Sequence, residues 1–236
     1  MQVIPIKTRI FQENEDLSTF VFKHVKKIPE KSILVITSKI VALSEGRTIE
    51  YRSKKQKTEL IKKESDFAIK TKYTWLTIKA GTVMASAGVD ESNAKGKLIF
   101  LPKDSFRSAL ILRKKLMQKF HLRNLGVLIT DSRLMPLRVG VVGVALGYVG
   151  FQGIRNYIGT KDIFGRTLKM SRTDVADSLA TSAVLCMGEG KEQQPLALIT
   201  EAPVKFVEKV NKKELNIKLT EDIFYPMLKN IHAKKE

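Results

Sequence analysis

Two short runs of apolar residues, many of them β-branched, constrain the fold of this chain more than any other feature of its sequence. One run covers residues 32–37 (SILVIT) and the other covers residues 125–130 (LGVLIT). Runs of this length and composition are typical of buried strands. The second run leads directly into Asp131 and Ser132, and α/β proteins commonly present ligand-binding side chains at the carboxyl end of such a strand. We therefore expect a buried sheet with polar groups at its strand ends.

The rest of the chain alternates between helical spacing of apolar residues and short strands separated by glycine-rich turns. This irregular mixture favours an α+β fold with mixed sheets and helices over a regular βαβ succession. Helices are expected over residues 16–28, over 54–70, from Asp104 or Ser105 to about Phe120, and from Ser171 or Thr173 to Met187. Strands are expected over residues 73–78, 82–87, 97–101, 139–147 and 195–200.

The length of 236 residues fits one large domain or two packed smaller ones. We predict a main domain over residues 1–200, either undivided or built from two packed subdomains. Residues 201–236 are predicted to form a basic C-terminal extension with one helix near residues 220–232, which must accommodate Pro226.

The formal net charge of +18 favours anionic partners such as nucleotides, phosphorylated cofactors or nucleic acid. Aromatic residues are sparse and are not interleaved with the lysines, so binding of nucleic acid is not the favoured interpretation. No apolar stretch approaches the length of a membrane span and no signal-peptide pattern is present, which predicts a cytoplasmic protein without a membrane partner. The single cysteine excludes an intramolecular disulfide and a cysteine-based zinc site.

Two aspartates are the best candidates for chemistry on the residues alone. Asp90 and Asp131 each stand at a junction between a strand and a loop, beside small polar residues. Carboxylate and hydroxyl oxygens suit Mg²⁺ or Mn²⁺, which are hard cations. The segment Gly188-Glu189-Gly190 follows a helix and could approach a phosphate by its backbone while adding Glu189 as a third acidic ligand, or could be a simple helix cap. Neither the Walker-type nor the Rossmann glycine motif occurs.

Taken together, several short segments resemble the serial motifs of the coenzyme F420-0:L-glutamate ligase (gamma-glutamyl ligase) family. The resemblance spans residues 8 to 200. It is carried by residues 38–47 (SKIVALSEGR), 87–93 (AGVDESN), 129–132 (ITDS), 141–147 (VVGVALG), 158–166 (IGTKDIFGR), 175–177 (VAD) and 187–190 (MGEG).

The resemblance implies a GTP-dependent ligase that works as an intertwined homodimer with a divalent-metal site. By this resemblance Asp90, Asp131, Ser132 and Glu189 would hold Mg²⁺ or Mn²⁺, and Asp131 and Arg138 would act in catalysis. The nucleotide would be bound by Ser38, Lys39, Asn93, Gly188 and Gly190. The other expected ligand is an anionic small-molecule substrate.

The chain also departs from the family's pattern at two places. Leu43 stands where the family has a lysine that contacts nucleotide, and Leu134-Met135 replace a Gly-Arg pair. Leucine supplies neither a charge nor a hydrogen bond. Either Lys39, Arg133 or Arg138 takes over these contacts, or the use of nucleotide has changed.

The leading hypothesis is a metal- and nucleotide-dependent ligase, using GTP or ATP, that joins glutamate to a carboxylate-bearing cofactor. The cofactor would be either F420-0-like or folate-like, and the reaction would pass through an acyl phosphate. The alternative is a catalytically altered family member that acts as a basic protein binding nucleic acid or another anion.

Overall fold

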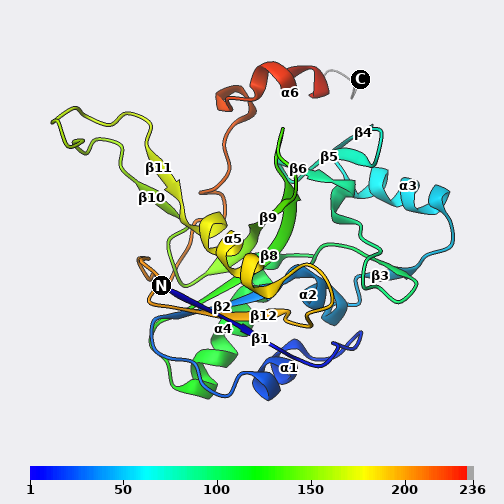
Figure 1. The fold of residues 1–236 in the computed structure, drawn as a ribbon, viewed down its shortest axis with the longest axis horizontal. Helices are drawn as coiled ribbons and strands as arrows, with labels where there is room; N and C mark the ends of the chain where they lie inside the picture. The colour runs from blue at the N-terminus through cyan, green and yellow to red at the C-terminus, as the bar shows by residue number, and fades with distance from the viewer. Residues whose placement is uncertain (233–236) are drawn as a thin grey trace.

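The computed structural model describes residues 1–232, and its centre is a five-stranded mixed sheet (Figure 1). The strand order is β1-β12-β2-β8-β9; β2 and β8 run parallel, and the other neighbouring pairs are antiparallel. The predicted strand over residues 32–37 is confirmed, whereas the strand predicted over 125–130 continues to Leu134. The bounds are β1 Gln2–Ile6, β2 Ser32–Thr37, β8 Leu125–Leu134, β9 Val141–Val149 and β12 Leu196–Thr200.

Helices cover both faces of this sheet, as Figure 1 shows. Helices α1 (Leu17–His24) and α4 (Ser105–Phe120) pack on one face, and α5 (Val175–Met187) packs on the other. Strand β2 is buried from both sides: Leu34 and Ile36 join the α1/α4 cluster, while Ile33 and Val35 join the α5 cluster. Each such side chain contributes about 1.5–3 kcal/mol on burial. This double burial explains the apolar run without polar alternation, and the mixed arrangement confirms the α+β class.

The helix ends follow from local capping. Helix α4 begins after Asp104, whose carboxylate accepts a hydrogen bond of 2.9 Å from the backbone N–H of Arg107, as predicted. Helix α1 ends at His24, four residues before the predicted end, because Val25 adopts an extended conformation while keeping its side chain in the core. Helix α5 starts later than predicted, because residues 172–174 pair in a hairpin first; it ends against Gly188 as predicted.

A smaller α+β unit lies between β2 and α4 in the sequence. Its strands form a three-stranded sheet, β4-β5-β6, and a separate pair, β3-β7. The helix predicted over residues 54–70 is wrong beyond Glu64: Ser65 is extended, and residues 67–70 pair with β5 instead. The bounds are α2 Ser38–Ser44, β3 Thr48–Glu50, α3 Lys54–Glu64, β4 Phe67–Lys70, β5 Trp75–Lys79, β6 Thr82–Ala85, η1 Ser86–Gly88 and β7 Lys97–Ile99.

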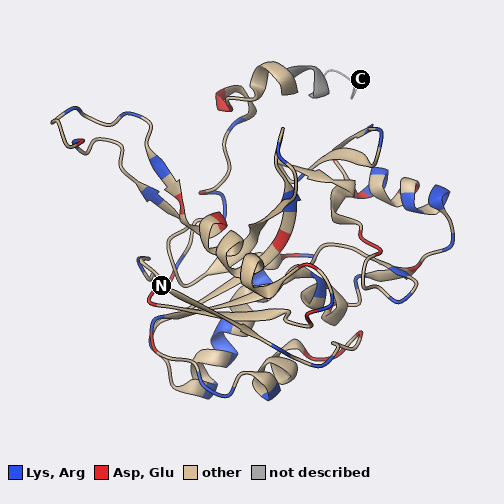
Figure 2. Ribbon diagram, in the orientation of Figure 1, with Lys and Arg blue, Asp and Glu red and all other residues tan. Residues whose placement is uncertain are grey.

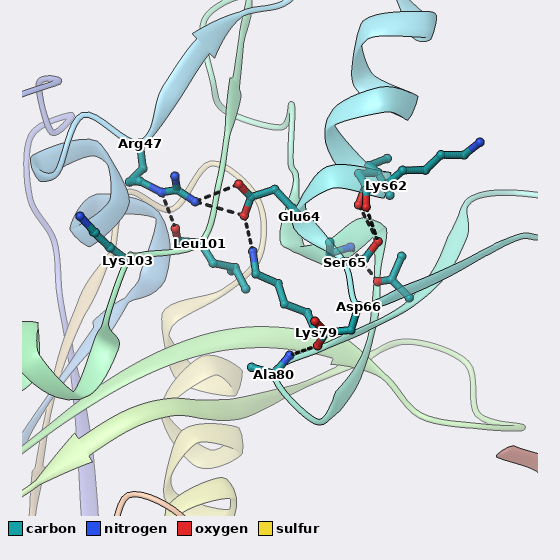
Figure 3. Close-up of polar contacts among 12 residues, drawn as sticks. Arg47, Lys62, Glu64, Ser65, Asp66, Lys79, Ala80, Leu101 and Lys103 are labelled. Carbon is teal, nitrogen blue, oxygen red and sulfur yellow. Dashed lines mark hydrogen bonds and ion pairs between the residues drawn. The ribbon is translucent and has the colours of Figure 1, made fainter. Parts of the chain in front are cut away.

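Glu64 joins three parts of this unit (Figure 3). Its carboxylate accepts hydrogen bonds from Nη2 of Arg47, at 3.1 and 3.3 Å, and from Nζ of Lys79, at 2.6 Å. Nε of Arg47 also donates to the backbone oxygen of Leu101 at 3.2 Å. Burial raises the pKa of Glu64, but the two cations outweigh burial and the net pKa lies below its ordinary value. Arg47 therefore serves to hold the small unit together.

Two segments extend from the body in Figure 1. Strands β10 (Ile154–Asn156) and β11 (Arg172–Asp174) form the base of a projecting hairpin, the β10–β11 arm. The chain ends in η2 (Leu219–Glu221) and α6 (Tyr225–His232), whose start at Tyr225 leaves Pro226 in the first turn, where proline is tolerated. Residues 233–236 of the predicted extension lie outside the described residues, and a division of the chain at residue 200 stays a prediction.

Positive charge is distributed over many elements, including α3 and the base of the β10–β11 arm (Figure 2). Within residues 1–232, no helix combines the length and the apolar character required to cross a membrane.

The segment after residue 200 is tied to the core by a buried arginine. Arg113 on α4 is 4% exposed; its Nε donates to the backbone oxygen of Leu125 at 2.7 Å, and its two terminal nitrogens donate to the carboxylate of Glu208 at 3.0 and 2.9 Å. This bidentate pair fixes the C-terminal segment against α4 and β8.

Replacing Glu208 by glutamine is expected to destabilise the protein by about 1–3 kcal/mol, because the buried guanidinium loses a charged acceptor. The free energy of unfolding measured in urea checks this. Glu221→Gln is the control, since the Lys218–Glu221 pair is solvent-exposed and should contribute at most about 0.5 kcal/mol. Equal effects of the two substitutions would contradict the prediction.

Two helix caps are expected to respond to pH with opposite sign. Burial, with repulsion from Asp177, raises the pKa of Asp174 to about 6, although backbone hydrogen bonds oppose the shift. The pKa of Asp16, the cap of α1, is lowered by hydrogen bonds from Thr19. The folded state binds the Asp174 proton more tightly than the unfolded chain does, so ionisation of Asp174 lowers the stability of the fold as pH rises from about 4 to 6. The ionised carboxylate of Asp16 instead stabilises the fold above its unfolded pKa, and this contribution is lost on acidification.

Asp174→Asn is therefore expected to stabilise the protein by up to about 1 kcal/mol at pH 7 and to have no effect near pH 4. Asp16→Asn should destabilise by roughly 0.5 kcal/mol at pH 7, and this difference should disappear as the pH falls through the lowered pKa of Asp16. Thermal unfolding across pH measures both, and a stabilising effect of Asp174→Asn that grows toward acid pH would contradict the account.

Candidate functional site

The parallel pairing of β2 and β8 brings two predicted site residues together. Thr37 is in register with Thr130, so the residues that follow them, Ser38 at the start of α2 and Asp131 in β8, are neighbours. Oγ of Ser38 donates to Oδ1 of Asp131 at 3.3 Å. Asp131 and Ser132 lie within β8, paired with β9, rather than beyond the end of the strand as predicted. The pairing of β2 with β8 therefore brings the first residue of α2 beside Asp131.

Asp90 is fixed in the loop that precedes β7. Its backbone forms an isolated bridge with Ile99, and its carboxylate accepts hydrogen bonds from the backbone N–H of Ser92 at 2.8 Å and from its hydroxyl at 2.7 Å. Nζ of Lys39, on the first turn of α2, lies 2.8 Å from Oδ2 of Asp90 and donates to the backbone oxygen of Ser92 at 2.7 Å. The loop and the start of α2 thus form one connected unit.

The turn after α5 completes a group of polar residues that we call the site cluster: Ser38, Lys39, Asp90, Ser92, Asn93, Asp131, Ser132 and Glu189. Oγ of Ser132 donates to Oε1 of Glu189, and Nδ2 of Asn93 donates to the backbone oxygen of Gly190 at 3.4 Å. The backbone N–H of Gly190 donates to the carboxylate of Glu192 at 2.8 Å. Gly188 caps α5, with a positive φ of 80°.

Arg138 stands apart from this group. It lies in the exposed turn between β8 and β9, and its backbone N–H donates to the oxygen of Met135 at 3.3 Å. Leu43, at the position where the family pattern has a lysine, packs with Ala42, Ala94 and Ile99 in a small apolar cluster. Two surface hollows, beside Glu201 and beside Asp16, lie away from the cluster.

The two aspartates have opposite pKa shifts. Burial raises the pKa of Asp131, and the neighbouring charge of Asp90 adds to this; Arg133 and hydrogen bonds from Ser132 and Ser38 oppose the shift without cancelling it. Burial also raises the pKa of Asp90, but hydrogen bonds from Lys39 and Ser92 outweigh it, so the net pKa is lowered. A bound cation would offset both the cost of burying the Asp131 carboxylate and the repulsion between Asp131 and Asp90.

These residues fit a divalent cation by their chemistry. The carboxylates of Asp90 and Asp131 and the hydroxyl of Ser38 converge here, and such hard oxygen donors suit Mg²⁺ or Mn²⁺. Within residues 1–232, no three His, Cys, Asp or Glu side chains form a ready metal cluster, so serine hydroxyls and ligand oxygens would have to complete the coordination shell.

The sequence comparison decides the family. The model of the F420-0:gamma-glutamyl ligase family matches residues 5–201. The chain belongs to this family. A coenzyme F420:L-glutamate ligase of Methanococcus maripaludis (strain C7) is 35% identical over 244 residues, covering 95% of this chain and 97% of that protein. The enzyme of the same name from Methanocaldococcus jannaschii is 33% identical, covering 87% of this chain and 90% of that protein.

For this F420-0:gamma-glutamyl ligase family member, sequence reasoning named the two aspartates but missed how they are held. Ser92 bonds to both Asp90 and Lys39, and the Asp-x-Ser spacing of a side-chain-to-backbone turn is a signal that could have identified it. The Lys39–Asp90 and Ser132–Glu189 contacts join segments that are distant in the sequence, so no local sequence pattern predicts them.

Proposed function

We infer that this chain joins L-glutamate in amide linkage to a carboxylate of a coenzyme F420 precursor, at the expense of a nucleoside triphosphate. The family match over residues 5–201 and the names of the similar proteins support this. The observation that carries the proposal is the convergence of Ser38, Asp90 and Asp131 from three separate segments of the chain. An F420-0-like acceptor is preferred to a folate-like one because the similar proteins are named for coenzyme F420.

The proposed reaction has two steps. The acceptor carboxylate attacks the terminal phosphorus of the nucleotide, which forms an acyl phosphate and releases the nucleoside diphosphate. The amine of glutamate then attacks the acyl carbon, phosphate leaves, and the amine loses a proton as the amide forms. Most of the catalytic effect in such chemistry comes from positioning and from neutralising phosphoryl charge.

The residues of the cluster divide into two groups in this proposal. Asp90 and Asp131 would hold Mg²⁺ or Mn²⁺, with Ser132 and Glu189 completing the protein's share of the ligands. When bound, the cation supplies charge neutralisation at phosphoryl oxygens. The ammonium of Lys39, paired with Asp90 in the structure, would orient an anionic group beside it. Asn93 and the Gly188–Gly190 turn would contact the nucleotide.

Calorimetric titration with GTP and with ATP, each in the presence and absence of Mn²⁺, tests this proposal. Binding that requires Mn²⁺ is expected, with GTP preferred. Absence of binding for both nucleotides would overturn the proposed mechanism. Salt-sensitive retention on nucleic acid in that case would favour the alternative, a basic anion-binding protein.

A homodimer is part of the same proposal. The β10–β11 arm exposes Ile163, Phe164 and Met170, each about nine-tenths accessible, and large apolar side chains gathered on a projecting segment are typical of an interface. We expect the protein to elute as a dimer in size-exclusion chromatography with light scattering. The double substitution Ile163→Asp and Phe164→Asp should shift it toward the monomer; an unchanged dimer would exclude the arm as the interface.

A further inference from the structure

Arg133 follows Asp131 on the same face of β8. The register from Asp131↔Val144 to Arg133↔Val142 is regular, and the irregularity of the β8–β9 pair lies earlier, at Ile129/Thr130. Side chains two residues apart in a regular strand point to the same face of the sheet. The strand therefore places a guanidinium group beside the carboxylate that the proposed function assigns to metal.

The guanidinium of Arg133 is buried but poorly paired. Arg133 is 9% exposed, and its described hydrogen bond runs from Nη1 to the backbone oxygen of Val83, at 3.2 Å. Its Nε is buried without a hydrogen-bond partner among residues 1–232. A guanidinium has five N–H donors, and buried donors without acceptors reduce stability.

The other buried arginine of this chain shows the usual solution. Each nitrogen of the Arg113 guanidinium donates a hydrogen bond, to a backbone oxygen or to an oxygen of Glu208. Arg133 instead has two carboxylates in its electrostatic range, Asp131 and Asp177, and forms an ion pair within 4.0 Å with neither. Asp177 accepts a hydrogen bond from the backbone N–H of Ala145 at 2.8 Å. Nε and Nη2 of Arg133 therefore lack an acceptor among the described residues.

We propose that Arg133 binds an oxyanion of a ligand, a phosphate or a carboxylate, at the Asp131 site. The planar fork of N–H donors matches both groups. An oxyanion bound here would supply the acceptor that the guanidinium lacks. The identity of the ligand rests on the proposed function, in which the candidates are a nucleotide phosphate and the carboxylate of glutamate.

The test compares wild type with Arg133→Gln and Arg133→Lys in calorimetric titrations with three probes: L-glutamate, inorganic phosphate and Mn²⁺ with GTP. We expect Arg133→Gln to reduce the affinity for one of these probes by about 10-fold or more. Arg133→Lys should recover part of this affinity, because it keeps the positive charge but loses the planar set of N–H donors. The melting temperature of Arg133→Gln should stay equal or rise, because an unpaired buried charge is removed.

The control is Arg113→Gln, which should lower the melting temperature and leave the affinities unchanged. Equal affinities of wild type and Arg133→Gln for every probe, or no binding of any probe to wild type, would overturn the anion site. Phosphate or glutamate binding that depends on Arg133, without any nucleotide binding, would keep the anion site and reject the ligase mechanism. If Arg133→Gln does not fold, Arg133→Lys alone decides the question. Binding of all three probes by Arg133→Lys with wild-type affinity would then reject the anion site.

Discussion

Asp131→Ala is expected to weaken Mn²⁺-dependent nucleotide binding by at least about 100-fold, because the proposed metal site loses its most buried carboxylate. The same substitution should leave the metal-free protein as stable as wild type or slightly more stable. Burial and the charge of Asp90 raise the pKa of Asp131, so its ionised form costs stability above that pKa. Calorimetric titration and thermal unfolding of the same preparation measure the two effects.

Asp66→Ala is the matched control for this substitution. Asp66 accepts a hydrogen bond of 2.8 Å from the backbone N–H of Ala80 in the small unit (Figure 3) and belongs to no part of the cluster. Its replacement should leave nucleotide affinity within about twofold of wild type. Undiminished affinity in Asp131→Ala would remove Asp131 from the metal site.

Gly150→Ala is expected to lower the free energy of unfolding by roughly 3–5 kcal/mol. Gly150 has a φ of +87°, and a Cβ atom there would lie 2.1 Å from the backbone oxygen of Leu125. That oxygen is also the acceptor for Nε of Arg113. The added methyl group would thus push against the backbone of β8 and disturb the arginine that ties down the C-terminal segment.

Gly159→Ala separates backbone strain from steric clash. Gly159 has nearly the same φ, +86°, but a Cβ atom there would meet nothing within 4 Å. We expect a cost of about 1 kcal/mol at this position, from the left-handed conformation alone. Urea unfolding of both variants checks the difference, and equal costs at the two glycines would show that the contact with Leu125 is unimportant.

Sequence patterns predicted the elements whose signals are local. The strand 32–37 was correct because burial from both sides requires an uninterrupted apolar run, and α4 was correct because Asp104 caps it. Strand β1 was not predicted; it contains Pro5 and lies at the edge of the sheet, where proline is tolerated. The strand predicted over residues 125–130 was too short, because pairing with β9 extends β8 through the charged residues Asp131 and Arg133.

The candidate site was accessible to sequence reasoning only in part. Asp90 and Asp131 could be named because acidic residues at strand ends are a recognisable pattern. Their partners could not be predicted, since the Lys39–Asp90 pair and the Ser38–Asp131 hydrogen bond depend on how β2, β8 and the small unit pack. The buried state of Arg133 likewise follows from the approach of β6 to β8, which brings Val83 to its guanidinium.

Mass spectrometry of a ligation reaction tests the central claim most directly. The purified protein would be incubated with F420-0, L-glutamate, GTP and Mn²⁺, and the deazaflavin products would be analysed together with the released GDP and phosphate. The account predicts a product heavier by one glutamyl residue, with one GDP and one phosphate formed per amide, and none of these in Asp131→Ala. Metal-dependent binding of GTP without any glutamylated product would contradict it.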